Sequence, residues 1–311
     1  MFESHWRFAA ERPRIYLKRL NGDPPPWTND PILADHKFTN VFRAADRVSQ
    51  YCIKQVIYEG GSMAPEEVVF RILLFKLFNS IPALETLTAA LGTPTWKNFD
   101  ASTYGDILGK AKDRGVKIWN AAYMQKPQYR EDLPTKHERY LALVEHLMHS
   151  GVTQRLLSAK TYEQAYNVLR SYPLFGDFLS MQLLTDLNYS PVLNFDEDDF
   201  IMPGPGALNG INKCFGLSLS KDNSQDLKGA AFIIEAMVAG QDGFLDHFGE
   251  RPVTLFGRRL HLIDCQNLFC ETDKYARVAH PTFNLKRSGI RQKLKPAGSL
   301  PKPFFPAKWG I

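Results

Sequence analysis

The sequence holds few cysteines and no apolar run long enough to cross a membrane. Its four cysteines, at positions 52, 214, 265 and 270, show no paired framework and lack the spacing of an iron–sulfur cluster, which favours a reducing cytoplasm over secretion. The most apolar stretch, Val68–Ile81, contains Arg71 and Lys76 and is shorter than the ~20 residues of a spanning helix. The first residues are charged, unlike a signal peptide. We therefore expect a cytoplasmic protein without membrane contact.

Acidic residues are absent from positions 281–311, although the whole chain has a net charge of only +5. Such a basic stretch repels itself unless it meets a polyanion, so DNA phosphates are the expected contacts of Arg287, Arg291 and Lys293. The alternative is a solvated basic tail. Interleaved aromatic residues indicate instead that part of the stretch packs on the protein; these are Phe283, Phe304, Phe305 and Trp309.

Apolar residues recur at spacings of three and four along most of the chain, which predicts a mainly α-helical fold. With 311 residues, of which 44% are hydrophobic, the chain can bury one large core or two packed subdomains. We expect residues 1–311 to form a single monomeric unit, in which 1–125 and 263–311 make one subdomain and 136–240 the second, with a cleft between them. Helices are predicted at 3–20, 38–58, 65–80, 82–91, 102–113, 136–149, 161–171, 177–187, 207–216, 226–239 and 263–278, and a strand-like hairpin at 251–261 around Phe256.

Two glycine-containing segments approach nucleotide-binding motifs without matching them. Gly105–Ala111 is one residue short of a phosphate-binding P-loop and lacks the hydroxyl residue that would hold magnesium, so no kinase is recognisable in the chain. Gly204–Gly210 has the wrong spacing for a dinucleotide site. We expect it to open a helix whose first amides, beside Gly204 and Gly206, are suited to a DNA phosphate.

The stretch from 161 to 199 predicts two helices joined by a tight hairpin and followed by an acidic loop. Thr161 and Gln164 form a capping-box pair for the first helix, and a proline at 173 ends it. Gly176 is expected to take the positive φ that a sharp reversal needs, and to offer backbone amides to a DNA phosphate. Asp198 follows Gly176 by 22 residues.

This pattern resembles the helix-hairpin-helix DNA glycosylase superfamily, whose hairpin ends in a glycine and whose catalytic aspartate lies about as far downstream. Leu174 stands where the superfamily has the first glycine of its Leu-Pro-Gly-x-Gly pattern, and Ser180 stands where strand-cutting members carry a Schiff-base lysine. The resemblance implies a helix-hairpin-helix glycosylase-like fold and a monofunctional enzyme that uses water as its nucleophile. It implies Asp198 as the catalytic carboxylate, with Glu197 and Asp199 as substitutes, and neither metal nor organic cofactor.

The chemistry of base removal explains why a carboxylate is needed. Cleavage of an N-glycosidic bond passes through a sugar cation, which a nearby carboxylate stabilises while it orients the attacking water. A run of like charges such as Asp196–Asp199 is otherwise typical of a solvated surface loop.

Four further segments resemble a helical family linked to phage base hypermodification; they are Trp27–Leu33, Lys37–Tyr51, Gly204–Ile211 and Ile263–Tyr275. That family includes the helical domain of 5-hydroxymethyluracil DNA kinases, α-glutamyl/putrescinyl-thymine pyrophosphorylase-like proteins and anti-phage glycosylases that excise modified bases. The resemblance implies a partner, double-stranded DNA with modified bases.

A base must leave the duplex to reach a catalytic group, so a pocket is needed to read it. The candidates, all from the family segments, are Trp27, Asn40, Arg43, Asp46, Gln266 and Asn267. Two alternatives stay open. Arg43 and Asp46 can instead form an internal ion-pair network, and the polar side chains of 263–278 can tie that helix to the 40–50 segment.

The favoured function is hydrolysis of the N-glycosidic bond of a hydroxymethylated or glycosylated base in DNA, in anti-phage defence. One alternative is a group-transfer enzyme that hypermodifies a pyrophosphorylated hydroxymethyl-pyrimidine, with Asp196, Asp198 and Asp199 as metal ligands. The other is a non-catalytic DNA-binding module that serves a separate enzyme. Loss of the base from the sugar distinguishes the first from both others.

Overall fold

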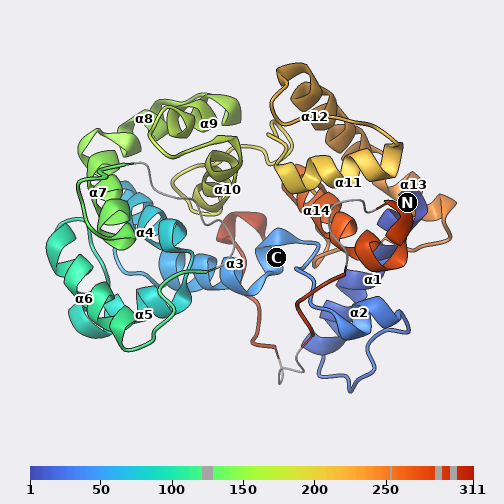
Figure 1. Cartoon of the computed structure of the whole chain (residues 1–311), viewed down its shortest axis with the longest axis horizontal. Coiled ribbons are helices and arrows are strands. Elements are labelled where there is room, and N and C mark those ends of the chain that lie inside the picture. Colours follow the sequence, from blue (N-terminus) through green and yellow to red (C-terminus); the bar gives the residue numbers. More distant parts are fainter. Residues whose placement is uncertain (121–128, 253, 284–288, 295–299) are drawn as a thin grey trace. The chain divides into compact units, whose positions relative to one another are not determined.

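The computed structural model describes residues 1–120, 129–252, 254–283, 289–294 and 300–311. Within these ranges the chain is mainly helical, as predicted, and its extended pairings are the isolated bridges His36–Lys293 and Leu255–Arg258 (Figure 1). In the same ranges no helix is both long and apolar enough to cross a membrane.

Contacts divide the chain into two compact units. Unit 1 consists of residues 1–46, 200–303 and 311, and unit 2 of residues 47–199 and 304–310. The subdomains expected from the sequence group the chain differently, with 1–125 and 263–311 in one and 136–240 in the other. That these ranges form subdomains stays a prediction.

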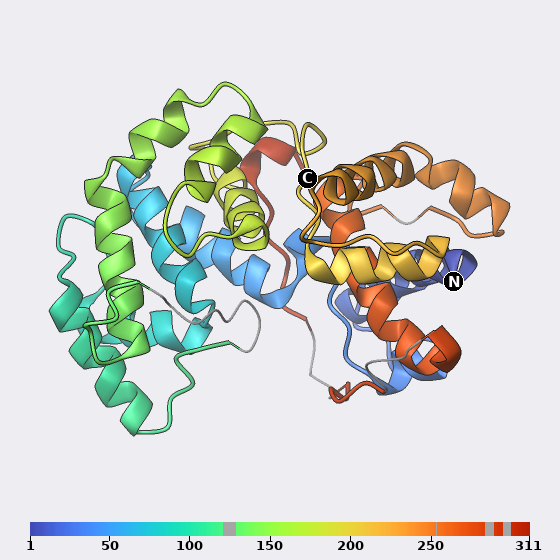
Figure 2. The same cartoon turned by 45° about the horizontal axis from the view of Figure 1, so that its top comes forward.

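Unit 1 is built around α14 (Leu262–Ala279). The helices that pack on α14 are α1 (Phe2–Leu20), α2 (Pro31–Asp35), α11 (Pro205–Phe215) and α12 (Ser224–Ala239), while α13 (Gln241–His247) packs on α1. Figure 2 shows α11, in yellow, lying along α14. Aromatic side chains such as Trp6 and Phe269, both fully buried, fill the core between these helices.

Glycines let α11 approach α14 closely. A Cβ atom added to Gly210 would lie 2.1 Å from the carbonyl oxygen of Phe269, and one added to Gly206 would lie 2.5 Å from the Sγ atom of Cys270. Both distances are below van der Waals contact. Gly210 accepts only glycine at the present helix separation because the close atom is main chain, whereas a residue at 206 would require the Cys270 side chain to move.

A Gly210→Ala variant should therefore lower the free energy of unfolding by about 1–3 kcal/mol, because the two helices must move apart. Gly229→Ala is the matched control, since nothing lies within 4 Å of its added methyl group on α12. That control should be stabilised by about 0.5–1 kcal/mol through helix propensity. Urea unfolding measures both, and equal stability of Gly210→Ala and the native protein would contradict the close-packing argument.

Unit 2 is built around α4 (Pro65–Phe78), which is buried from Val68 to Phe78 as its apolar sequence predicts. The elements that pack on α4 are the π-helix η2 (Cys52–Tyr58), α5 (Ile81–Leu91), α7 (Lys136–His149), α8 (Val152–Ser158) and α10 (Asp177–Asn188). Further out, α3 (Arg47–Tyr51) leads into η2, α6 (Ala101–Asp113) packs on α5 and α7, and α9 (Tyr162–Arg170) packs on α8 and α10. The P-loop-like segment Gly105–Ala111 is part of the helix α6, not a phosphate-binding loop.

The end of the chain, residues 304–310, is docked on unit 2 and includes the short 3-10 helix η4 (Ala307–Trp309). The side-chain amide of Gln50 donates to the carbonyl of Phe304 at 3.0 Å and accepts from its N–H at 2.8 Å. Phe305 stacks on Trp309, and Lys308 donates to the carbonyl of Leu193. The prediction that part of the basic stretch packs on the protein is confirmed here, whereas Phe283 is 54% exposed.

The single helix predicted at 38–58 is wrong in its first part. Residues 38–42 are irregular, the 3-10 turn η1 spans Arg43–Ala45, and the α-helix begins only at Arg47. The apolar spacing reflects burial of Phe38, Val41 and Phe42 from an irregular backbone. Three short helices, α2, α8 and α13, were not predicted, because five to seven residues show too few repeats of the helical period.

Candidate functional site

The hairpin between α9 and α10 reverses through a left-handed leucine. Leu174 has φ +67°, whereas Gly176 has φ −72° and caps α10, so the positive φ expected at Gly176 lies two residues earlier. The N–H of Gly176 donates to the carbonyl of Leu174 at 3.1 Å and is therefore engaged within the turn. A left-handed leucine costs roughly 1–2 kcal/mol, and the buried Phe175 next to it supplies the anchoring contact.

Side chains of α9 hold the start of α10. Arg170 Nε donates to Asp177 Oδ1 at 2.6 Å, and the Tyr166 hydroxyl donates to the same oxygen at 2.9 Å. Burial alone would raise the pKa of Asp177, but these two hydrogen bonds outweigh it and keep the pKa below its ordinary value. The first helix begins as expected at Thr161, whose hydroxyl accepts from the Gln164 N–H, although the Gln164 side chain accepts from Lys160 and so does not close a capping box.

The acidic loop is fixed where it begins. Asn188, at the end of α10 and 1% exposed, donates from Nδ2 to the carbonyl of Phe195 at 3.1 Å and accepts from the Phe195 N–H at 3.0 Å. The Phe195 ring stacks on Tyr162, with centroids 5.8 Å apart. These contacts hold the main chain one residue before the carboxylates.

Within the loop, the carboxylates have different surroundings. Asp196 Oδ1 accepts from the N–H of Asp198 at 2.9 Å, so Asp196 shapes the turn. Asp198 and Asp199 are exposed, and Glu197 is half-buried. Ser180, the residue at the Schiff-base position, is fully buried on α10, and its hydroxyl donates to the carbonyl of Phe175 at 3.4 Å.

Unit 1 holds a second polar cluster, in which side chains bind an irregular main-chain segment. Glu271 on α14 accepts from the N–H of Thr39 at 2.8 Å, and Asp264 accepts from the N–H of Arg43 at 2.7 Å. Arg12 on α1 donates to the carbonyl of Phe38. These bonds replace the helical ladder that the segment lacks. For Asp264, the alternative that α14 side chains tie this helix to the 40–50 segment is confirmed, while Glu271 bonds Thr39 just before that segment.

Two base-pocket candidates stand out in this cluster because one polar atom of each is buried without a hydrogen bond. Asn40 Oδ1 and Gln266 Nε2 are these atoms, on side chains of residues that are 3% and 2% exposed. An unsatisfied buried polar atom costs about 1–3 kcal/mol, which a ligand with matching groups would recover. Gln266 Oε1 already accepts from the N–H of Gly204 at 3.2 Å, which orients the amide.

The remaining base-pocket candidates are engaged or lie elsewhere in unit 1. Arg43 is buried, and Asp46 accepts from the N–H of Asn40 at 3.0 Å. Asn267 is half-buried on α14. The described contacts of Trp27 are with the end of α1, where its indole N–H donates to Asp23 and the guanidinium of Arg19 lies 5.0 Å above its ring.

Three of the residues predicted to contact DNA outside the hairpin already have partners within the protein. The Gly204 N–H is bonded to Gln266, and Gly206 lies against α14. Lys293 pairs with Asp35, and its segment bridges to His36. Arg291 is exposed, and Arg287 lies outside the described residues. Contact of these residues with DNA stays a prediction.

Other features lie away from the predicted residues. A groove of about 560 Å³ in unit 2 is lined by the end of α3 and by η2, α4 and α5, including Tyr51, Arg71 and Glu85, and by none of the predicted site residues. The four cysteines are free, and Cys265 and Cys270 are helix residues of α14 as predicted. Among the described residues, no three His, Cys, Asp or Glu side chains are grouped so that they could hold a metal ion.

Together these observations define a helical protein with a carboxylate loop in one unit and an incompletely bonded amide pair in the other. The chain belongs to the family described as 5-hmdU DNA kinase, helical domain, whose sequence model matches residues 1–285. A curated relative is the 5-hmdU DNA kinase of Bacillus phage SP10, which is 22% identical over 236 residues. This match covers 69% of the present chain and 36% of the phage protein, so the chain spans about a third of its relative. No solved structure matches the chain.

Proposed function

We propose that this protein hydrolyses the N-glycosidic bond of a hydroxymethylated or glycosylated base in double-stranded DNA. Asp198 is the carboxylate that stabilises the sugar cation and orients water, with Glu197 and Asp199 as its substitutes. Within unit 1, Asn40 and Gln266 are the candidates for contact with a base edge, because side-chain amides offer both the donor and the acceptor that a pyrimidine edge requires. Removal of such bases from invading DNA would serve anti-phage defence.

The observation that carries this proposal is the coupling of the hairpin to the acidic loop within unit 2. The left-handed φ lies at Leu174, the position of the first glycine in the superfamily pattern that the sequence resembles. At the other end of α10, the Asn188 amide fixes Phe195 directly before the carboxylates. A main-chain segment fixed directly before a carboxylate helps to hold that carboxylate in position for a reaction.

The family relationship supports action on a modified base, while the reaction rests on the site. The phage relative is named as a kinase for 5-hmdU in DNA, and this chain matches about a third of it. The P-loop-like segment is part of a helix here, so it is not a phosphate-binding loop. A second candidate is a DNA-binding module that serves a separate enzyme, because the matching family is described as the helical domain of a kinase.

Protein treated with EDTA should still produce alkali-labile sites in DNA that contains 5-hydroxymethylated or glucosylated pyrimidines, because hydrolysis by a carboxylate consumes only water. Free base and abasic sites are measured by mass spectrometry and gel cleavage, with unmodified DNA as the control. Pyrophosphate release from a pyrophosphorylated base, with loss of activity in EDTA and an intact base–sugar bond, would instead establish the group-transfer reaction. Binding without either product would establish the DNA-binding module.

A further inference from the structure

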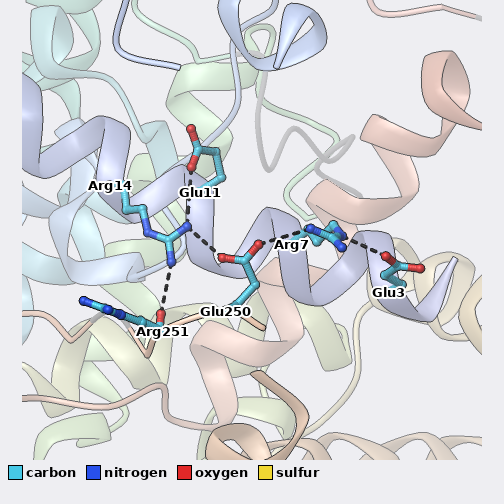
Figure 3. A network of polar contacts seen from close by, with 6 residues as sticks. All are labelled: Glu3, Arg7, Glu11, Arg14, Glu250 and Arg251. Carbon is cyan, nitrogen blue, oxygen red and sulfur yellow. Dashed lines mark hydrogen bonds and ion pairs between the residues drawn. The ribbon is translucent and has the colours of Figure 1, made fainter. Parts of the chain in front are cut away.

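The loop between α13 and α14 in unit 1 is firmly held where it begins. Glu250 forms ion pairs with Arg14 at 2.8 Å and with Arg7 at 3.5 Å, both on α1 (Figure 3). Arg14 also donates to the carbonyl of Arg251 at 3.3 Å. The network extends along α1 through Glu3 and Glu11, which pair with Arg7 and Arg14. The first residues of the loop are thereby fixed to the longest helix of unit 1.

The same loop is held where it ends. Gln241, 3% exposed, donates to the carbonyl of Leu260 and accepts from its N–H, both at 3.0 Å. Arg259 donates to the carbonyl of Val238 at 2.7 Å. Because both ends are anchored, the turn between them is presented on a rigid base.

An exposed phenylalanine occupies the tip of this turn in a strained conformation. Leu255 and Arg258 pair through two hydrogen bonds of 2.8 and 3.0 Å, and the two residues between them both have positive φ, +51° at Phe256 and +96° at Gly257. Such turns favour Asn, Asp or Gly at the first position, where a phenylalanine costs on the order of 1–3 kcal/mol. Leu255 is 2% exposed and anchors the turn, while Phe256 is 49% exposed. A half-exposed aromatic residue therefore occupies a position that ordinarily favours a small or polar one.

The charges around the tip match a polyanion. Three arginines, at positions 251, 258 and 259, lie in the same loop, and no acidic residue occurs from 251 to 260. Glu250, which directly precedes this stretch in the sequence, is paired with two arginines of α1. A loop that carries both cationic residues and an apolar tip suits a protein that holds phosphates and pushes a side chain between base pairs.

We propose that Phe256 inserts into the DNA stack and takes the place of the base that leaves it. This proposal rests on the proposed function in so far as a base is extruded. Aromatic stacking on the neighbouring bases would stabilise the distorted duplex, and the left-handed backbone projects the ring from the tip of the turn. The occupant of this surface is thus a DNA duplex with a modified base.

Phe256→Asn removes the ring, and asparagine tolerates the left-handed conformation, so the turn should remain folded. With 2-aminopurine placed beside a 5-hydroxymethyluracil, the fluorescence rise caused by unstacking should fall roughly tenfold in this variant. Phe256→Tyr should behave like the native protein because it keeps a stacking ring. Phe232→Ala, which removes a 69% exposed ring from α12, should change nothing and is the matched control.

The two proposals fail in different ways in this assay. A native fluorescence rise in Phe256→Asn, or no rise in the native protein on modified DNA, would overturn insertion by Phe256. Unstacking that depends on Phe256 but is not followed by base release would support insertion and refute hydrolysis. Thermal unfolding of Phe256→Asn at or above the native midpoint shows that a lost signal is not a loss of fold.

Discussion

An Asp198→Asn variant should release modified bases at least about a hundredfold more slowly than the native protein, while its affinity for the same DNA stays within about twofold. Asparagine keeps the size of the side chain and removes the negative charge that stabilises the sugar cation. The main-chain N–H of residue 198 can still donate to Asp196, so the loop keeps its turn. Single-turnover base release and fluorescence anisotropy with labelled DNA measure the two quantities separately.

Asp196→Asn is the matched control for loop charge. It removes one charge from the same loop, but its amide oxygen can still accept from the N–H of residue 198. We expect this variant to lose less than about tenfold in rate. Equal losses in both variants would show that the total charge of the loop matters instead of one carboxylate. Full activity of Asp198→Asn would refute Asp198 as the catalytic carboxylate and leave Glu197 and Asp199 as the candidates.

Most of the helices could be predicted from the sequence because their apolar faces repeat over several turns. Residues 38–46 could not, because the same apolar spacing arises in a segment whose main chain is bonded by Arg12, Asp264 and Glu271 from distant parts of the sequence. Periodicity reports which residues are buried, and only the hydrogen-bond partners decide whether the backbone is helical.

The hairpin shows a similar limit at a single residue. A glycine is the ordinary choice for positive φ, so Gly176 was the natural prediction, yet Leu174 takes that conformation. The alignment with the superfamily pattern already placed Leu174 at the first glycine, and this was the signal that could have located the left-handed residue. No sequence pattern indicated the role of Asn188. Its two hydrogen bonds join it to Phe195 across a turn that cannot be recognised from composition.

The sequence pointed to polar residues near the candidate site, but it did not show which of them have structural roles. Asp264 and Glu271 bind main-chain amides, Gly206 permits close packing, and Asp196 shapes a turn. These structural roles were weighed as alternatives for the α14 residues only. The sequence predicted a hairpin around Phe256, but the strained φ of this residue and the anchored ends of its loop depend on contacts with distant residues.

The other large effect concerns the stability of α10, the helix that links the hairpin to the acidic loop. Lys76 on α4 and Asp186 on α10 form an ion pair of 2.6 Å, and their side chains are only 4% and 3% exposed. Asp186→Ala should lower the free energy of unfolding by about 3–5 kcal/mol, because it leaves the ammonium group of Lys76 buried without its counter-charge. Urea unfolding followed by circular dichroism measures this loss.

Replacing both partners tests whether the penalty comes from the stranded charge. The double variant Lys76→Met with Asp186→Leu removes both charges and keeps an unbranched side chain at 76 and a branched one at 186, so its stability should return close to that of the native protein. Asp132→Ala breaks a 2.7 Å pair with Arg130 in which both side chains are more than half exposed, and it should leave the unfolding midpoint unchanged. If the double variant is as unstable as Asp186→Ala, the pair contributes specific bonds that apolar packing cannot replace. If it is stable but releases no base, the charges are needed to set the position of α10, and hence of Asn188 and the acidic loop, and not merely to keep the unit folded.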